Sequence, residues 1–162
     1  MDNTPVRPDG KIERIVDEYA SALFRMCLVM LRSVPDAEDA VQDALLAYLC
    51  RAPQFDSPGS ERAWLFTVAA NRCRDSLREA KRHPRVSMDE LSGLGAERED
   101  LGVLEALMAL PEKFRLVLTL HYVEGYSTAE IAAMIGRTPS AVKMRLKKGR
   151  ALLENELGKE RE

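Results

Sequence analysis

Long apolar runs are absent from this sequence of 162 residues, and no stretch approaches the roughly 20 apolar residues that a membrane-spanning helix needs. The opening residues, Met1 to Pro5, lack the basic stretch and following apolar stretch of a secretory signal. Neither sign of charge dominates, because 24 lysines and arginines face 26 aspartates and glutamates. We therefore expect a cytoplasmic protein that is not embedded in a membrane, and a uniformly basic nucleic-acid-binding coat is excluded.

Cysteine is scarce, with only 3 residues in the chain. Cys27, Cys50 and Cys73 lie far apart beside apolar neighbours, without a Cys-x-x-Cys pair or a partner histidine at ligand spacing. A zinc site and a disulfide framework are therefore not indicated, and we expect no bound metal. Three reduced and mostly buried thiols are the main prediction, and a redox-sensing thiol is the alternative.

The residue patterns of catalysis are missing as well. The sequence shows no paired carboxylates, no nucleophile beside a base and no glycine-rich phosphate loop. Its 2 histidines, His83 and His121, are isolated, and we expect them to be hydrogen-bonded or exposed bystanders. The protein is therefore predicted not to be an enzyme and to take neither a cofactor nor a small-molecule substrate.

The near-balance of charge hides a strong segregation along the chain. Residues 137–150 contain six basic side chains and no acid, and residues 62–85 contain seven basic side chains against two acids. Residues 86–112 hold seven carboxylates against one arginine, and residues 36–43 hold four carboxylates and no base. Two basic surfaces joined by an acidic connector predict two modules that bind polyanions. Solvated helix faces would explain any one block better than they explain the whole pattern.

No segment alternates like a β-strand for long, whereas helical spacing recurs throughout. The predicted fold class is all-α, with two small helical bundles joined by a flexible linker, the second containing a helix-turn-helix. The predicted domains are a flexible arm (1–10), a first bundle (11–84), an acidic linker (85–100) and a second bundle (101–158). Helices are expected over about 11–32, 36–50, 60–82, 101–110, 112–123, 127–136 and 138–157. Asp36 is the expected N-cap of the second helix.

Capping and turn signals define the helix-turn-helix. Ser127 and Glu130 have the spacing of a capping box, in which each side chain satisfies a free backbone N–H of the other. Gly136 suits the left-handed residue that ends a helix, and Thr138-Pro139 supplies an N-cap and a first-turn proline for a longer basic helix. In this motif the second helix lies in the major groove of DNA.

The second helix of the motif separates apolar from basic residues. Its apolar residues repeat at helical spacing and are expected to be buried, while its cations repeat on another face. Side chains near the helix start can reach base edges, and cations further along meet phosphates. A basic helix that only packs on a neighbour is the alternative. The apolar stripe is Val142, Leu146, Gly149 and Leu153, and the predicted DNA contacts are Thr138, Ser140, Ala141, Lys143, Met144, Lys147 and Arg150.

The basic helix predicted near residues 60–82 has the same division. One stripe is apolar and expected to pack inward, and a second stripe is polar and mostly cationic. The amide of Asn71 can donate to and accept from a base edge, while nearby arginines hold the backbone. Trp64 is either a stacking platform or part of the core. The inward stripe is Phe66, Ala70, Cys73 and Leu77, and the predicted nucleic-acid contacts are Trp64, Thr67, Asn71, Arg74, Arg78 and Lys81.

Four segments, taken in order, resemble a known family. Residues 37–46 (AEDAVQDALL) resemble its AEDLVQDVFL stretch, and residues 63–75 (AWLFTVAANRCRD) resemble its WLxxIAxNxxxD helix. Residues 110–118 (LPEKFRLVL) resemble its LPxxxRxVxxL segment, and residues 122–153 resemble its region 4 helix-turn-helix. The family is that of the bacterial extracytoplasmic-function (ECF) sigma factors, small promoter-recognition subunits of RNA polymerase.

This resemblance implies a partner for each feature. The acidic helix with Asp39, Gln42 and Asp43 would dock on the clamp coiled coil of the β′ subunit of core RNA polymerase, and the β flap is a further expected contact. The residues 60–82 helix would engage and open the −10 element, with Asn71 near a pocket for an extruded base. The last helix would bind the −35 element of promoter DNA, and the acidic linker would thread the polymerase cleft. Family analogy adds an anti-sigma factor, which would hold the chain at the inner membrane face.

Two departures from the family pattern concern base preference. Ala141 replaces a frequent threonine, and Lys147-Lys148-Gly149-Arg150 replaces the common Arg-Ala-Arg run. Two other functions stay open. A stand-alone helix-turn-helix regulator would bind palindromic sites as a symmetric dimer, but it leaves the acidic block 36–43 unexplained. A protein-binding adaptor that only sequesters a regulator leaves the basic residues 143–150 unexplained.

Overall fold

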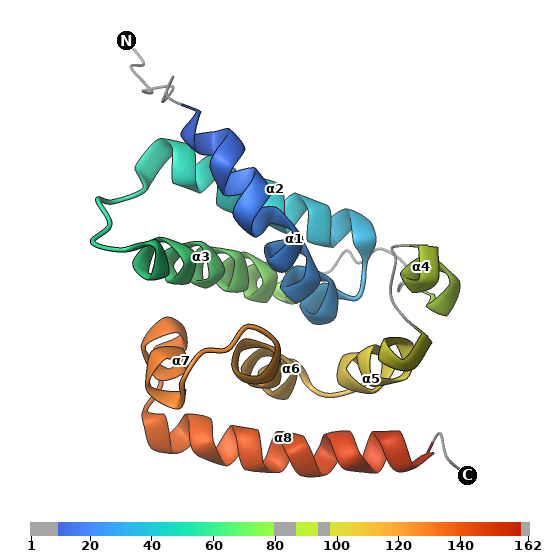
Figure 1. The fold of residues 1–162 in the computed structure, drawn as a ribbon. Helices are drawn as coiled ribbons and strands as arrows, with labels where there is room; N and C mark the ends of the chain where they lie inside the picture. The colour runs from blue at the N-terminus through green and yellow to red at the C-terminus, as the bar shows by residue number, and fades with distance from the viewer. Residues whose placement is uncertain (1–9, 80–86, 94–97, 160–162) are drawn as a thin grey trace. The chain divides into compact units, whose positions relative to one another are not determined.

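Two compact helical units make up the structure, a computed structural model that describes residues 10–79, 87–93 and 98–159. Unit 1 spans residues 1–83 and unit 2 spans residues 84–162. Every regular element in the described residues is helical (Figure 1), so the predicted all-α class with two bundles is confirmed. None of the helices in these residues is both long and apolar enough to cross a membrane.

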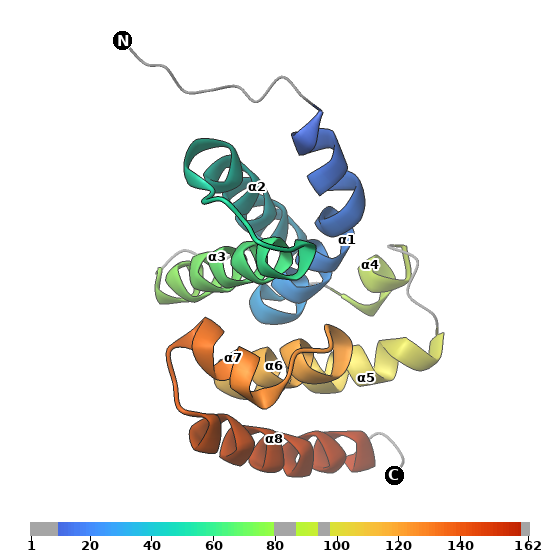
Figure 2. The same ribbon diagram turned by 60° about the vertical axis from the view of Figure 1, so that its left-hand side comes forward.

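Unit 1 is a bundle of three helices: α1 (Lys11–Leu31), α2 (Val34–Arg51) and α3 (Pro58–Arg78). Each helix packs against the other two, and the three lie side by side in both views (Figure 1, Figure 2). Phe66, Ala70 and Cys73 of the predicted inward stripe are buried, and Leu77 is half-buried. Burial of a large apolar side chain is worth about 1.5–3 kcal/mol, so this stripe fixes which face of α3 is left for solvent.

Serines cap the second and third helices. The Ser33 Oγ accepts a hydrogen bond from the Asp36 N–H at 3.3 Å, so the prediction of Asp36 as the N-cap is wrong. The Ser57 Oγ accepts from the Ser60 N–H at 3.1 Å, and α3 begins before the predicted start at Ser60. Both helices carry a proline in the first turn, where the backbone N–H groups have no partner within the helix. These prolines therefore mark helix starts, although the sequence pattern favoured loops there.

The third helix also ends earlier than predicted. Its C-cap residue, Glu79, has an extended backbone with φ −74° and ψ 145°, so α3 stops at Arg78 instead of near residue 82. Lys81, a predicted contact, and His83 lie outside the described residues. None of the three cysteines, all of which lie in the described residues, forms a disulfide. Cys27 and Cys73 are buried as expected, and Cys50 is exposed on α2.

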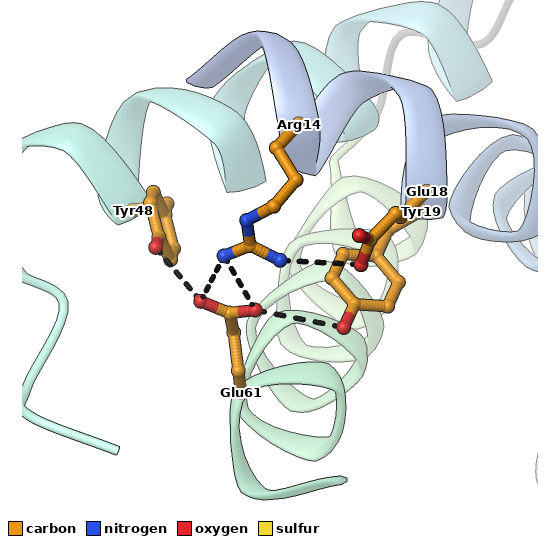
Figure 3. A network of polar contacts seen from close by, with 5 residues as sticks. All are labelled: Arg14, Glu18, Tyr19, Tyr48 and Glu61. Atoms are coloured by element: carbon orange, nitrogen blue, oxygen red, sulfur yellow. Dashed lines mark hydrogen bonds and ion pairs between the residues drawn. The ribbon is translucent and has the colours of Figure 1, made fainter. Parts of the chain in front are cut away.

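A buried carboxylate joins the three helices of unit 1 (Figure 3). Glu61 on α3 is only 7% exposed, and both of its oxygens lie 3.0 Å from Nη2 of Arg14 on α1. The Tyr48 hydroxyl of α2 donates to Glu61 at 2.8 Å, and the Tyr19 hydroxyl of α1 approaches it at 3.5 Å. A buried charge needs such partners, because desolvation would otherwise destabilise the fold by several kcal/mol. No local pattern in the sequence predicts this network.

Unit 2 contains α4 (Met88–Gly93), α5 (Arg98–Met108), α6 (Glu112–Leu118), the π-helical turn η1 (Thr119–Val123), α7 (Thr128–Ile135) and α8 (Pro139–Lys159). The long α8 packs against α5, α6 and α7, as Figure 1 and Figure 2 both show. Val117, Leu120 and Ile131 are among the fully buried side chains of this unit. The core of unit 2 therefore holds the two helices of the predicted motif in place.

Two segments of unit 2 differ from the prediction. A single helix was predicted over residues 112–123, but its last turn is π-helical, with the Glu124 N–H bonded to the Thr119 carbonyl at 3.0 Å. The predicted linker, residues 85–100, contains α4 and the first residues of α5. A capping box begins α4: the Ser87 N–H donates to Glu90 Oε1, and the Glu90 N–H donates to Ser87 Oγ, both at 3.2 Å. The Ser-x-x-Glu spacing was visible in the sequence and predicts this helix.

An arginine with 3% exposure, Arg115, joins α5 to α6. Its Nη1 donates to the Leu110 carbonyl at 2.7 Å and lies 3.4 Å from the Met108 carbonyl. The Met108 carbonyl ends α5 and the Leu110 carbonyl follows it, where the helix supplies no donors for them. The arginine of the LPEKFR segment therefore has a structural role, because it binds the carbonyls that follow α5.

Candidate nucleic-acid interface

The helix-turn-helix begins with the predicted capping box. The Ser127 N–H donates to Glu130 Oε1 at 3.0 Å, and the Glu130 N–H donates to Ser127 Oγ at 3.1 Å. The backbone hydrogen bond from Ser127, followed by the contact with its side chain, lowers the pKa of the Glu130 carboxyl. The start of α7 is thus fixed by local chemistry that the sequence predicts.

The turn between α7 and α8 also follows the prediction. Gly136 has φ 69° and ψ 38°, the left-handed conformation that glycine adopts without strain, and its N–H donates to the Ala132 carbonyl. The Thr138 Oγ1 accepts a hydrogen bond from the Ala141 N–H at 3.1 Å, and α8 begins at Pro139. Thr138 is therefore the N-cap of α8, and its hydroxyl proton is left for an outside acceptor.

The buried face of α8 is the predicted apolar stripe. Val142, Leu146 and Gly149 are buried, and Leu153 is half-buried. A Cβ at Gly149 would lie 3.1 Å from Cδ1 of Leu118 on α6, closer than ordinary van der Waals contact. Glycine therefore lets α8 approach α6 closely.

The outer face of α8 presents most of the predicted DNA contacts to solvent. Met144 is 73% exposed, a high value for an apolar side chain. Arg150 Nη1 donates to the Tyr122 hydroxyl at 2.8 Å, so one cation of this face is held by a residue of η1. Tyr122 was not among the predicted contacts, because no local pattern links positions 28 residues apart. Ser140, Lys143, Met144, Lys147 and Arg150 are exposed, and Ala141 is half-buried.

Positive charge also gathers at the turn that precedes α8. Arg145 on α8 is half-buried, and Arg137 in the turn is exposed. Burial, and secondly the charge of Arg137, lowers the pKa of the Arg145 guanidinium. Two arginines that repel each other favour an approaching anion.

On α3 the predicted polar stripe is divided between solvent and internal contacts. The Thr67 hydroxyl donates to the Ala63 carbonyl at 2.7 Å, which leaves it acceptor capacity only. Asn71 Oδ1 accepts from Arg74 Nη2 at 3.0 Å, so the Asn71 NH₂ group is oriented by a neighbouring cation. Asn71 and Arg78 are exposed, and Trp64, Thr67 and Arg74 are half-buried.

Trp64 belongs to an aromatic cluster and keeps part of its surface in solvent. Its ring makes edge contacts with Tyr48 at 6.3 Å and Phe55 at 6.0 Å between centroids, and the Arg51 guanidinium lies 6.0 Å from its centroid. Trp64 therefore packs partly in the core, as one interpretation of the sequence expects, and its role as a stacking platform stays a prediction. The cluster joins α2, the loop after it and the start of α3.

The acidic helix α2 carries two exposed predicted contacts and one that is paired within unit 1. Asp39 and Gln42 are exposed, whereas the Asp43 carboxylate forms an ion pair with Arg72 Nη2 of α3 at 2.7 Å. This hydrogen bond and the charge of Asp43 raise the pKa of the Arg72 guanidinium. On the same helix, Leu46 is 51% exposed. The outer side of α2 is therefore a mixed acidic and apolar surface, with one of its charges partly compensated.

The described residues were expected to hold no metal, and His121 was expected to be a bystander. Within residues 10–79, 87–93 and 98–159 no group of three or more His, Cys, Asp or Glu side chains could hold a metal ion. His121, predicted to be a bystander, donates through Nδ1 to the Tyr126 carbonyl at 2.8 Å. The exposed polar and cationic groups of α3 in unit 1, and separately those of α8 in unit 2, suit binding to phosphates and base edges.

Comparisons with known proteins identify both units. The Sigma-70 region 2 family model matches residues 15–83, and the Sigma-70 region 4 model matches residues 101–153. The ECF RNA polymerase sigma factor SigM of Mycobacterium tuberculosis is 34% identical over 150 residues, covering 90% of this chain and 76% of the relative. The chain belongs to the ECF sigma factor family. SigW of Bacillus subtilis, another ECF sigma factor, is 29% identical, covering 88% of this chain and 87% of its own.

Solved structures agree on the fold of this ECF sigma factor. CnrH, in complex with the cytosolic domain of CnrY, matches with a TM-score of 0.69 and 28% identity, over 91% of this chain and 87% of CnrH. RpoE in complex with the anti-sigma factor NepR from Bartonella quintana matches with a TM-score of 0.72 over 92% of this chain and 98% of that chain. At 21% identity the RpoE match shows the fold alone.

As an ECF sigma factor, the chain directs promoter-specific transcription initiation together with RNA polymerase and is not an enzyme. The two alternatives from the sequence, a stand-alone regulator and a sequestering adaptor, are thereby set aside. Family membership gives core RNA polymerase and promoter DNA as partners.

Proposed function

We propose that this sigma factor divides promoter recognition between two helices, with α3 engaging and opening the −10 element and α8 binding the −35 element. The observation that carries the proposal is the exposed basic face of α8, set on a correctly capped helix-turn-helix whose apolar stripe is buried. Such a face suits the major groove, where the first turns of the helix reach base edges and later cations reach phosphates.

At the −35 element, two kinds of contact are assigned to α8. Ser140, Ala141 and Met144 lie in its first turns and would face base edges, with the exposed Met144 suited to the methyl group of a thymine. Lys143, Lys147 and Arg150 would neutralise phosphates and so make binding sensitive to salt. The free hydroxyl proton of Thr138 suits a phosphate near the helix start.

At the −10 element, the exposed amide of Asn71 would meet an extruded base of the non-template strand. Arg74 orients that amide, and extrusion costs a few kcal/mol that edge hydrogen bonds and stacking must offset. The half-exposed ring of Trp64 would supply the stacking. Arg78 and Thr67 would hold the adjoining backbone, and Lys81 would extend this surface beyond the described residues.

The acidic face of α2 would dock on the clamp coiled coil of the polymerase β′ subunit. Exposed Asp39 and Gln42 supply charge and hydrogen bonds, and exposed Leu46 adds an apolar contact. Asp43 is pre-oriented by Arg72, which removes part of its charge but fixes its geometry. The docking is therefore expected to depend more on Asp39 than on Asp43.

The division of labour requires a connection between the two modules. The proposed domains are residues 11–84, 85–100 and 101–158. The acidic connector (85–100) would thread the polymerase cleft, and the second module (101–158) would contact the β flap. Two moderate DNA contacts in one chain gain effective concentration only when their spacing is fixed. The isolated chain is therefore expected to bind promoter DNA poorly.

An anti-sigma factor is part of the same proposal. It is supported by CnrH, a relative solved in complex with the cytosolic domain of CnrY. A cytoplasmic place for this chain is supported by its function, because core polymerase and promoter DNA are there. An anti-sigma factor anchored in the membrane would hold the chain at the inner face until a signal releases it.

Run-off transcription with purified core polymerase on a genomic promoter library tests the proposal. We expect transcription from promoters that share two elements, and we expect Lys143→Glu to weaken use of the −35 element while core binding is unchanged. Lys159→Glu, a charge reversal near the far end of α8, is the matched control. Failure of the chain to co-migrate with core polymerase, or tight specific DNA binding by the chain alone, would contradict the proposal.

A further inference from the structure

A tyrosine and an arginine from different elements form an exposed pair beside the basic face of α8. The Tyr122 hydroxyl accepts a hydrogen bond from Arg150 Nη1 at 2.8 Å, and Tyr122 is 56% exposed. Within the described residues, no carboxylate forms a salt bridge with Arg150. The guanidinium is therefore oriented by a neutral group, and its full positive charge remains for an anion from outside.

The pair has hydrogen-bonding capacity left over. The phenol oxygen accepts from Arg150, so its own proton can be donated to a further acceptor, and the guanidinium keeps four more N–H donors. Both groups lie at the surface, where they can converge on one acceptor with several oxygens. A phosphate, with a negative charge and two free oxygens in the nucleic-acid backbone, meets this requirement.

The tyrosine ring is itself held in place. It makes an edge contact with the His121 ring, with centroids 4.8 Å apart and planes at 81°, and His121 donates to the Tyr126 carbonyl at 2.8 Å. This links the π-helical turn η1 to the segment that precedes α7. The ring is therefore held by η1 and its neighbours, while the hydroxyl meets Arg150 of α8.

We propose that Tyr122 and Arg150 together form one phosphate-binding site for promoter DNA next to the bases that α8 contacts, an inference that rests on the −35 role of α8. The site takes one donor from η1 and the rest from α8, so a single phosphate would bind to two elements of unit 2 at once. It thereby fixes the rotation of α8 in the groove. Tyr122 is a binding residue and also the positioning residue for Arg150.

A scan with neutral methylphosphonate linkages tests the site. Each phosphate near the −35 element is replaced in turn, and promoter affinity is measured with reconstituted holoenzyme carrying the full-length chain. In the wild type we expect one position to weaken binding by about ten-fold, as for loss of a charge-assisted hydrogen bond. With Tyr122→Phe the same replacement should weaken binding only about two-fold, and with Arg150→Ala it should have almost no effect.

The double variant and a matched control complete the experiment. Tyr122→Phe/Arg150→Ala should weaken binding by less than the combined losses of the two single variants, because both groups serve one phosphate. Lys148→Ala removes an exposed cation that lies 5.9 Å from the Phe114 ring, and it should leave the position-specific effect intact. If Tyr122 had only a structural role, Tyr122→Phe would weaken binding to all of the modified DNAs equally. The position with the ten-fold effect would then remain.

The outcomes separate this inference from the proposed function. If the wild-type holoenzyme binds the promoter but no linkage shows a Tyr122-dependent effect, the phosphate site is wrong and the −35 role of α8 stands. The phosphate site is equally wrong if the pair instead binds an acidic partner protein, because promoter affinity would then not respond to either variant. If α8 variants such as Lys143→Glu also leave −35 use unchanged, the proposed function of α8 fails as well.

Discussion

The Asp43 carboxylate of α2 accepts two hydrogen bonds from the Arg72 guanidinium of α3, from Nη2 at 2.7 Å and from Nε at 3.1 Å. The sequence places Asp43 in an acidic block expected to face the polymerase and Arg72 in a basic block expected to face DNA. The ion pair joins these two surfaces of unit 1. Because the Arg72 and Asp43 side chains are 49% and 41% exposed, the pair is worth at most about 1 kcal/mol of stability.

This pairing makes Asp39 the more sensitive position for polymerase binding. Asp39→Lys should reduce association with core RNA polymerase at least about ten-fold, because it places a like charge against a basic partner. Asp43→Lys should also weaken association and should lower the free energy of unfolding by up to about 1 kcal/mol through loss of the Arg72 contact. Co-migration with core polymerase and urea unfolding measure the two effects. Asp17→Lys, at an exposed acid of α1, is the control, and unchanged association in both α2 variants would remove the clamp assignment.

The buried carboxylate of Glu61 should dominate the polar contribution to the stability of unit 1. Glu61→Ala should lower the free energy of unfolding by about 2 kcal/mol, less than the roughly 3–5 kcal/mol for breaking a fully buried pair, because the Arg14 side chain is 42% exposed. Tyr48→Phe should cost about 1 kcal/mol, since it removes one hydrogen bond to the carboxylate. Glu18→Gln, at the exposed partner of Arg14, should change stability by less than about 0.5 kcal/mol. If urea unfolding showed the same loss of stability for Glu18→Gln as for Glu61→Ala, Glu61 would not be the main polar contact of unit 1.

The capping box of α7 should give unit 2 an acid-sensitive contact. The pKa of Glu130 is lowered in the folded chain by the hydrogen bond from the Ser127 N–H and then by the Ser127 side chain. Glu130 therefore stabilises the fold fully at pH values above its ordinary pKa. This contribution is lost as the pH falls through the lower pKa that Glu130 has in the folded chain. In ¹³C NMR titrations, Ser127→Ala should bring the pKa of Glu130 part of the way back toward its ordinary value. The same variant should cost about 1 kcal/mol as a lost cap, and an unshifted pKa would contradict the hydrogen-bond account.

Close packing at Gly149 makes a size-dependent prediction. Gly149→Ala gains up to about 1 kcal/mol of helix propensity but places a methyl group 3.1 Å from Leu118, so its net effect should stay within about 1 kcal/mol. Gly149→Leu cannot be accommodated in this way and should cost at least about 2 kcal/mol. Ala151→Leu, at an exposed position of α8, is the control and should change little. Thermal unfolding would reject the packing account if Gly149→Leu were as stable as Ala151→Leu.

Local features of the sequence predicted most of the elements and failed at helix starts. The Ser127–Glu130 box, Gly136 and the Thr138 cap were all found, because each acts over no more than four residues. The prediction of Asp36 as the N-cap is wrong because Ser33 and Asp36 are both good N-cap residues, and a proline between them suits either a helix stop or a first turn. The helix α4 was missed because the acidic, glycine-containing composition of its segment outweighed the capping signal at Ser87.

By itself, the sequence determined the all-α class, the order of the helices, which stripe of α3 and of α8 is buried, and the family. The class, the helix order and the buried stripes follow from periodicity and capping, which depend on residues close together in the chain, and the family follows from the resemblance of four ordered segments to its motifs. Only the tertiary structure decided that Asp43 is paired with Arg72 across 29 residues, Glu61 with Arg14 across 47, and Arg150 with Tyr122 across 28. Such contacts depend on how helices pack in three dimensions, and no local pattern of residues encodes which charged side chains meet.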